Sequence, residues 1–403
     1  MNIQVEQPEK RKRTKKTKNL SPSSSSSSPP SSSSSPSLSS LPDEIVVNCL
    51  ARISRSYYPT LSLVSKSFRS ILSSTELYAA RSQLGSTEKC LYVCALDHGC
   101  FSTEWFRLWI NPNRTLPDSL TKKRRKKKKT VGVSFVSIPS PYIQSLPPSI
   151  VVGSEIYVVG GQWSPSSAVR VLDCRSNTWR DAPNMIVPRM FPRTCVHDKK
   201  IYVMGGRQVL ENESWVEVFD TKTQTWACLP DPGTEVRKSY IYRITEIDGK
   251  IYFDNRDNTM YAYDTKQGKW ECGKGVIATF PMSKCVIENI SYSYGLQLQG
   301  NNGCWWYDIK SDEWKEVKGL ESLKDKYKRS RGNAKVVSFG GNLLLLWEEC
   351  TNSNPNYRKK IWCAEIGLEK RDGGEVWGIV EWVDVVHSVP ISCKLFRCLV
   401  VSV

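Results

Sequence analysis

An aspartate followed six residues later by a tryptophan recurs four times in this chain of 403 residues. Successive copies lie 47, 44 and 44 residues apart. The residue before each aspartate is bulky and apolar, and the positions two and four residues before it are apolar as well. This alternation predicts a strand that ends at a polar turn, with the tryptophan starting the partner strand of a hairpin. The pairs are Asp173 and Trp179, Asp220 and Trp226, Asp264 and Trp270, and Asp308 and Trp314.

A second apolar strand lies upstream of each of the first three pairs. Its clearest copies read Ile-Tyr-Val-Val-Gly-Gly at 156–161 and Ile-Tyr-Val-Met-Gly-Gly at 201–206, and a degenerate copy occupies 251–256. Glycines suit positions where backbones approach closely or where φ must be positive, so we expect the pair at the narrow inner end of a radial sheet. The repeated Asp and Trp residues are interpreted as structural positions of the repeat and not as site residues.

The repeating unit spans about 45 residues and holds four potential strands. A four-stranded sheet with two apolar faces cannot stand alone, so the units should stack radially and close into a β-propeller, a mainly β fold. Six four-stranded blades are predicted, with five as the alternative, and the propeller is assigned to residues 88–403. The clear repeats are 150–194, 195–240, 241–285 and 286–330, and the partial blades are 88–149 and 331–403.

A helical segment precedes the repeats. From residue 41 the chain reads Leu-Pro-Asp-Glu-Ile, in which the proline suits the first helical turn and the acidic pair complements the helix dipole. Two apolar stripes with helical spacing follow, one over residues 45–53 and one over residues 61–72. Short helices cannot hide all of these apolar side chains from one another, and the leftover surface implies a partner protein.

These motifs resemble two known families in tandem. The Leu-Pro-Asp-Glu-Ile start and the stretch Leu-Ser-Leu-Val-Ser-Lys-Ser-Phe-Arg-Ser-Ile-Leu at 61–72 resemble the F-box, which we assign to residues 38–84. Ser65 and Phe68 stand where the common F-box pattern has Cys and Trp, and the plant F-box/kelch subgroup looks similar at this point. The Gly-Gly, Asp and Trp pattern resembles kelch repeats. It does not resemble WD40 repeats, because no Trp-Asp dipeptide closes the units. The chain is thus similar to plant F-box/kelch-repeat proteins.

This resemblance implies a non-enzymatic function without cofactor or metal. F-box helices dock on a Skp-type adaptor, which connects them to cullin, a RING protein and a ubiquitin-charged E2, and the propeller would hold a protein substrate near that E2. We expect the substrate receptor of an SCF-type ubiquitin ligase. The alternative is a kelch scaffold, or a nucleic-acid- or chromatin-associated propeller, acting outside ubiquitination. The adaptor contacts that the resemblance implies are Leu41, Pro42, Ile45, Leu50, Leu61, Val64 and Phe68.

The formal net charge of +17 comes almost entirely from two basic runs, at residues 10–18 and 122–129. They carry seven and eight positive charges, which leaves +2 for the rest of the chain. The folded part therefore lacks the broad basic face of a nucleic-acid-binding domain. The runs are interpreted as solvated tracts, nuclear-localisation signals or sites of non-specific nucleic-acid binding, and these three interpretations stay open. Residues 1–37, basic and then Ser-rich, are predicted to be disordered.

Other chemistry finds little support in the residues. There are three histidines and no nucleophile elbow, phosphate loop or zinc-protease helix. Cys90, Cys94, His98 and Cys100 have a spacing unusual for zinc, and we interpret the cysteines as buried core residues. No apolar run approaches the ~20 residues of a membrane span, and we expect no signal peptide. The expected location is the nucleus, the cytoplasm or both, with reduced thiols.

Overall fold

The computed structural model describes residues 41–100, 102–111, 132–141, 148–206, 213–238, 241, 243–254, 259–274, 284–296, 302–308, 310–311, 313–327, 334–350, 358–371 and 373–403. The tail predicted to be disordered and both basic runs lie outside these residues. The chain divides into two compact units, Met1–Asp43 and Glu44–Val403. The second unit contains every sheet and, apart from the first residue of the first helix, every helix described below.

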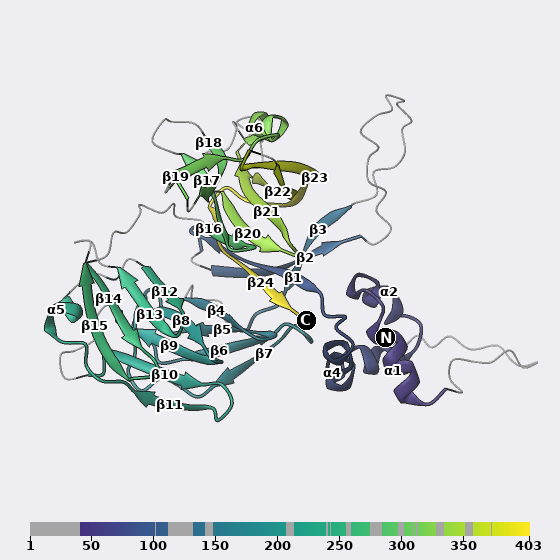
Figure 1. Ribbon diagram of the computed structural model, residues 1–403. Coiled ribbons are helices and arrows are strands. Elements are labelled where there is room, and N and C mark those ends of the chain that lie inside the picture. Colours follow the sequence, from purple (N-terminus) through teal and green to yellow (C-terminus); the bar gives the residue numbers. More distant parts are fainter. Residues whose placement is uncertain are drawn as a thin grey trace, which may run out of the picture. The chain divides into compact units, whose positions relative to one another are not determined.

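Within the described residues the strands form six four-stranded antiparallel sheets, here called blades 1 to 6 (Figure 1). Blade 1 is β24 (Cys393–Ser402), β1 (Lys89–Asp97), β2 (Ser102–Ile110) and β3 (Val133–Ile138). Blade 2 is β4 (Ser149–Val152), β5 (Glu155–Val159), β6 (Val169–Asp173) and β7 (Thr178–Ala182), and blade 3 is β8 (Arg193–His197), β9 (Lys200–Met204), β10 (Val216–Asp220) and β11 (Thr225–Cys228). Blade 4 is β12 (Arg243–Ile247), β13 (Lys250–Asp254), β14 (Thr259–Asp264) and β15 (Lys269–Lys274). Blade 5 is β16 (Lys284–Ile287), β17 (Ile290–Leu296), β18 (Asn302–Asp308) and β19 (Glu313–Glu316), and blade 6 is β20 (Lys335–Phe339), β21 (Asn342–Glu349), β22 (Arg358–Arg371) and β23 (Glu375–Pro390).

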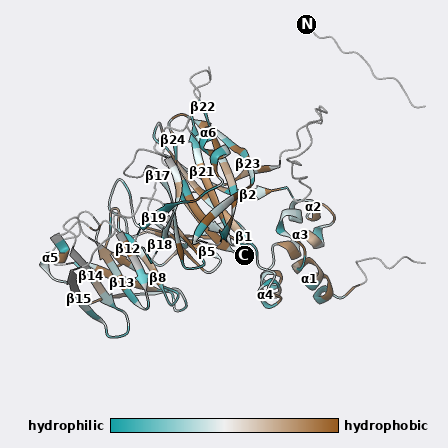
Figure 2. Ribbon diagram, turned by 45° about the horizontal axis from the view of Figure 1, so that its top comes forward, coloured by the Kyte–Doolittle hydropathy of each residue, from teal (hydrophilic) through white to brown (hydrophobic). Residues whose placement is uncertain are grey.

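The first strand of each blade, in the order given, faces the axis of the propeller. Strand β4 contacts β8 and β24, β8 also contacts β12, and β20 contacts both β16 and β24. Apolar clusters fill the spaces between neighbouring sheets: Phe106 and Leu108 of blade 1 pack with Leu344 and Ile361 of blade 6. Figure 2 shows hydrophobic stretches, in brown, along these strands. The six-bladed β-propeller is therefore confirmed, and the five-bladed alternative is wrong.

Blade 1 is assembled from both ends of the propeller sequence. Residues 88–149 contribute β1, β2 and β3, and the fourth strand is β24, which pairs antiparallel with β1 from Lys89 opposite Ser402 to Asp97 opposite Cys393. The segment 331–403 therefore holds all four strands of blade 6 and one strand of blade 1. This pairing closes the ring, because it leaves β1 no free edge.

The repeated aspartates shape the hairpin turns. Asp220 Oδ1 accepts hydrogen bonds from the backbone N–H groups of Lys222 and Thr223, at 2.8 and 3.3 Å. Asp264 repeats both bonds, and Asp173 and Asp308 each accept one from the backbone N–H two residues further on. Such side-chain bonds to the following backbone hold the turn in place. The structural interpretation of these aspartates agrees with this geometry.

The glycine pairs stand where a larger residue would not fit. Gly160 has a φ of +79°, a conformation that L-residues with a Cβ rarely adopt. A Cβ added to Gly161 would lie 1.9 Å from the backbone oxygen of Ser164. Both physical reasons proposed for the pair, close approach and positive φ, therefore apply in blade 2.

A buried ion pair joins the chain segment between blades 2 and 3 to β10. Arg189 and Glu217 both have fully buried side chains, and the closest nitrogen–oxygen distance between them is 2.8 Å. The guanidinium also donates to the carbonyls of Gly205, Ser214 and Trp215. Because every charged group has a partner, the segment that connects the two blades is held rigidly.

Replacing Glu217 with Gln is expected to lower the free energy of unfolding by about 3–5 kcal/mol, because the Arg189 guanidinium would then be buried without a counter-charge. Urea denaturation of the full chain measures the change. The matched control is Glu271→Gln, which removes an exposed partner of Lys250 and should alter stability little. Equal effects of the two substitutions would contradict this role for the pair.

Candidate functional site

A helical module precedes the propeller. It consists of α1 (Asp43–Ala51), a short 3-10 turn (Arg55–Tyr57), α2 (Tyr58–Leu61), α3 (Lys66–Leu72) and α4 (Thr75–Gln83). Its own core is small. The buried residues of this core are Val46, Leu50, Ala51, Tyr58, Leu72 and Leu77, with Leu61 and Phe68 packed against them. A core of this size cannot cover every apolar side chain of the module.

The second apolar stripe is interrupted, although its spacing predicted a periodic helical run over residues 61–72. Helix α2 ends at Leu61, and α3 begins only at Lys66. Ser65 adopts an extended conformation and its hydroxyl accepts a hydrogen bond from the backbone N–H of Phe68 at 3.0 Å. Ser65 is thus the N-cap that starts α3, and Leu63 and Val64 are left in the turn before it.

The turn between α2 and α3 presents large apolar side chains to solvent. Leu63 is 77% exposed and Val64 is 63% exposed. On α1, Ile45 is 47% exposed. Side chains of this size, exposed on a small module, make this turn a candidate surface for a protein partner. We call Leu63 and Val64 the apolar turn.

The predicted adaptor contacts separate into two groups in the structure. Ile45 and Val64 lie on the surface, and Leu41 and Pro42 are exposed where the first unit ends. Leu61 and Phe68 are half-buried against the module core, and Leu50 lies inside it at 3% exposure. The structure thus brings Leu50, Leu61 and Phe68 together at the module core, where Leu50 is buried and Leu61 and Phe68 are half-buried.

Leu63 was missed by the sequence argument. Its position falls between Leu61 and Val64 and outside the helical stripe, so periodicity assigned it no role. A usable signal was present, because Ser65 is a good N-cap residue. A helix that starts after Ser65 would have placed Leu63 in a turn.

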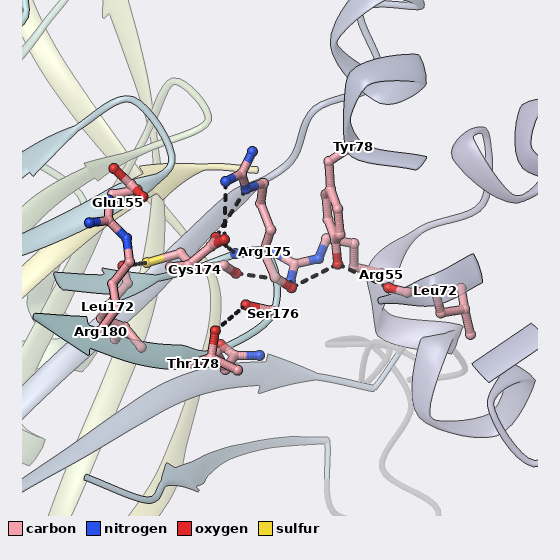
Figure 3. Close-up of polar contacts among 12 residues, drawn as sticks. Arg55, Leu72, Tyr78, Glu155, Leu172, Cys174, Arg175, Ser176, Thr178 and Arg180 are labelled. Carbon is pink, nitrogen blue, oxygen red and sulfur yellow. Dashed lines mark hydrogen bonds and ion pairs between the residues drawn. The ribbon is translucent and has the colours of Figure 1, made fainter. Parts of the chain in front are cut away.

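Two arginines attach the module to the propeller. Arg55, which is 5% exposed, donates from Nη2 to the carbonyls of Cys174 and Arg175 in the β6–β7 turn, at 3.1 and 3.0 Å. The hydroxyl of Tyr78 on α4 donates to the same Arg175 carbonyl at 2.8 Å (Figure 3). These bonds fix the module against blade 2.

Arg81 performs the second attachment from α4. Its Nη1 donates to the carbonyls of Ala51 and Ile53, and its Nη2 lies 3.2 Å from the carboxylate of Glu88, just before β1. Nη1 also donates to the hydroxyl of Tyr58 at 3.0 Å. Burial raises the pKa of Tyr58, with Arg81 acting in the opposite direction, so the phenol stays protonated as part of the core. The module is therefore a fixed extension of blades 1 and 2.

The described residues contain no group of three or more His, Cys, Asp or Glu side chains that could hold a metal ion. Cys94 lies in β1 and belongs to a core cluster with Tyr92 and Leu96. Burial raises the pKa of its thiol, so the thiolate that metals prefer is disfavoured. Among the described helices, none is both long and apolar enough to cross a membrane.

Comparisons with known proteins match both parts of the chain. A family model described as F-box domain matches residues 38–79, and one described as FKB95, Kelch-repeats domain matches residues 105–387. The chain is 59% identical to the F-box/kelch-repeat protein At4g19870 of Arabidopsis thaliana, over 100% of both chains. It is 60% identical to the F-box/kelch-repeat protein At4g19865 of the same plant, over 91% of this chain and 93% of the relative.

A closed kelch-type propeller behind an F-box module defines a class of adaptor proteins that are generally not catalytic and that present a substrate. Within that class, the chain belongs to the F-box/kelch-repeat protein family.

Proposed function

We propose that this chain is the substrate-recognition subunit of an SCF-type ubiquitin ligase, with its F-box module bound to a Skp-type adaptor and its propeller bound to a protein substrate. The observation that carries the proposal is the apolar turn, which the small core leaves exposed. F-box domains typically bind this kind of adaptor. An apolar surface that is exposed in the single chain can be buried when a partner protein binds to it.

The attachment of module to propeller supports the same proposal. Arg55 and Tyr78 converge on one carbonyl of the β6–β7 turn, that of Arg175, and Arg81 ties α4 to the residue before β1. A receptor that works by proximity needs such stiffness, because a fixed distance between substrate and ubiquitin-charged enzyme raises their effective concentration. The chain itself would supply positioning, and other subunits would supply the chemistry.

Replacing Leu41 and Pro42 together with Ala is expected to abolish co-purification with a Skp-type adaptor. Both side chains are exposed and outside the module core, so the propeller should remain folded, as circular dichroism and the melting temperature would show. The assay is a pull-down from co-expression of the full chain with the adaptor and cullin. An unchanged pull-down would count against contacts at these positions, and a wild-type chain that never binds the adaptor would favour a scaffold role outside ubiquitination.

A further inference from the structure

The axis of the propeller contains a chamber of about 550 Å³. Strands β4, β16, β20 and β24 contribute its lining. The described lining residues include two basic side chains, Lys335 and Arg397, two serines, Ser149 and Ser338, and no acidic residue. A cavity of this size is in the range that small ligands occupy.

The strands that face the axis carry a strong excess of positive charge. Arg193 starts β8, Lys335 starts β20, and β24 carries Lys394 and Arg397. Glu246 is the one acidic residue in these six strands. Its carboxylate lies 3.1 Å from His197 Nδ1 and also accepts a hydrogen bond from the backbone N–H of Gly249. The balance of charge around the axis therefore favours an anion.

Arg397 is half-buried, and its contacts differ from those of the buried arginines of the described residues, although Arg55 and Arg81 also have a buried Nε without a hydrogen-bond partner. Arg55 and Arg81 donate to several main-chain carbonyls, and Arg189 has a buried carboxylate as well. The Nε of Arg397 is buried without a hydrogen-bond partner among the described residues, and its guanidinium lies 5.5 Å from the ring of Phe396. Burial lowers the pKa of Arg397, and repulsion from Arg193 lowers it further. A half-buried cation that is repelled by a second cation is stabilised when a ligand neutralises it.

We propose that the axial chamber is a binding site for an oxyanion, a phosphate or carboxylate group, held by Arg397 and Lys335 with the hydroxyls of Ser149 and Ser338 at hand. Arginine binds such groups through two parallel hydrogen bonds, and lysine adds a point charge. The site stands on the propeller alone and does not depend on the adaptor role. The anion can belong to a free small molecule or to a side chain of a bound peptide.

The test measures the melting temperature of the full chain during titration with inorganic phosphate, against sodium chloride at equal ionic strength. Bound phosphate should raise the melting temperature of the wild type in a saturable way. Arg397→Met should weaken the apparent affinity for phosphate about tenfold or more, and Lys335→Met should weaken it as well. Phosphate also stabilises proteins non-specifically, so only the difference between wild type and Arg397→Met counts.

The matched control is Lys394→Met, which removes an exposed basic residue from the same strand and should respond to phosphate like the wild type. Without phosphate, Arg397→Met should melt no lower than the wild type, because the substitution removes a half-buried charge whose Nε has no hydrogen-bond partner. If Arg397→Met fails to fold, Lys335→Met still tests the site.

A second arm uses a short phosphoserine peptide and its unphosphorylated form. Stabilisation by inorganic phosphate shows that a free anion suffices, and stabilisation by the phosphopeptide alone assigns the site to a peptide side chain. Either result must be lost in Arg397→Met. The proposal is overturned if neither probe raises the melting temperature, or if wild type and Arg397→Met respond equally.

Discussion

A chain truncated before Cys393 is expected to lose the closed propeller and its cooperative unfolding transition. Truncation removes β24, in which Cys393, Leu395 and Val401 are buried. It also removes the strand that, among the described residues, pairs with the edge of β1 opposite β2. An open propeller exposes a strand edge and the apolar faces of two neighbouring blades, so the truncated chain should aggregate. Thermal denaturation and size-exclusion chromatography measure both effects.

A point substitution tests the same closure without a deletion. Val401 is fully buried, and Val401→Asp should lower the free energy of unfolding by about 4 kcal/mol or more, since it places a carboxylate in an apolar contact. The control is Ile391→Asp in the β23–β24 turn, where the side chain is 54% exposed; its stability should change little. A truncated chain that unfolds like the full chain would show that β24 does not close the ring.

Replacing Leu63 and Val64 together with Asp is expected to weaken adaptor binding by about 100-fold or more. Each residue is a large apolar side chain exposed on the module, and a central apolar contact of an interface typically contributes about 2 kcal/mol. Two charges in their place would have to be desolvated against the partner. Titration of the purified full chain with the adaptor, followed by calorimetry, measures the loss.

The design separates binding from folding. Leu63 and Val64 lie outside the module core, so the double variant should keep the wild-type melting temperature. The matched control replaces Ile379 and Ile391, two exposed apolar residues of the propeller, with Asp and should bind the adaptor normally. Undiminished binding by the Leu63 and Val64 variant would move the docking surface elsewhere on the module.

These two predictions act on different parts of the protein. Val401 belongs to a core cluster that also contains Tyr78 of α4, so loss of β24 should also disturb the packing of α4 against the propeller. Substitutions in the apolar turn should leave the propeller intact. A propeller without the module should still bind an anion in the axial chamber that we propose. A module without the propeller should bind an adaptor but present no substrate.

The repeat and the start of the F-box could be predicted from the sequence because they depend on interactions between residues close together in the chain. An aspartate such as Asp220 bonds to backbone groups two and three residues away, so its spacing reports each turn directly. Gly161 must be glycine because of a backbone oxygen three residues along the chain. The spacing of these residues predicted a propeller of six blades with five as the alternative, and the Leu-Pro-Asp-Glu-Ile start with its apolar stripes predicted a helical module before it.

Tertiary structure decided what depends on residues far apart in the chain. No local pattern states that β24 pairs with β1, because ring closure selects that partner. Burial separated Leu50 on the first apolar stripe from Val64 on the second, and the helix that starts after the N-cap Ser65 left Leu63 exposed in the preceding turn. The charge of Arg397 is visible in the sequence, but its place in the lining of the axial chamber, with a buried Nε that has no hydrogen-bond partner, appears only in the folded propeller. Sequence spacing determines turns and faces, and only packing determines which side chains remain without partners.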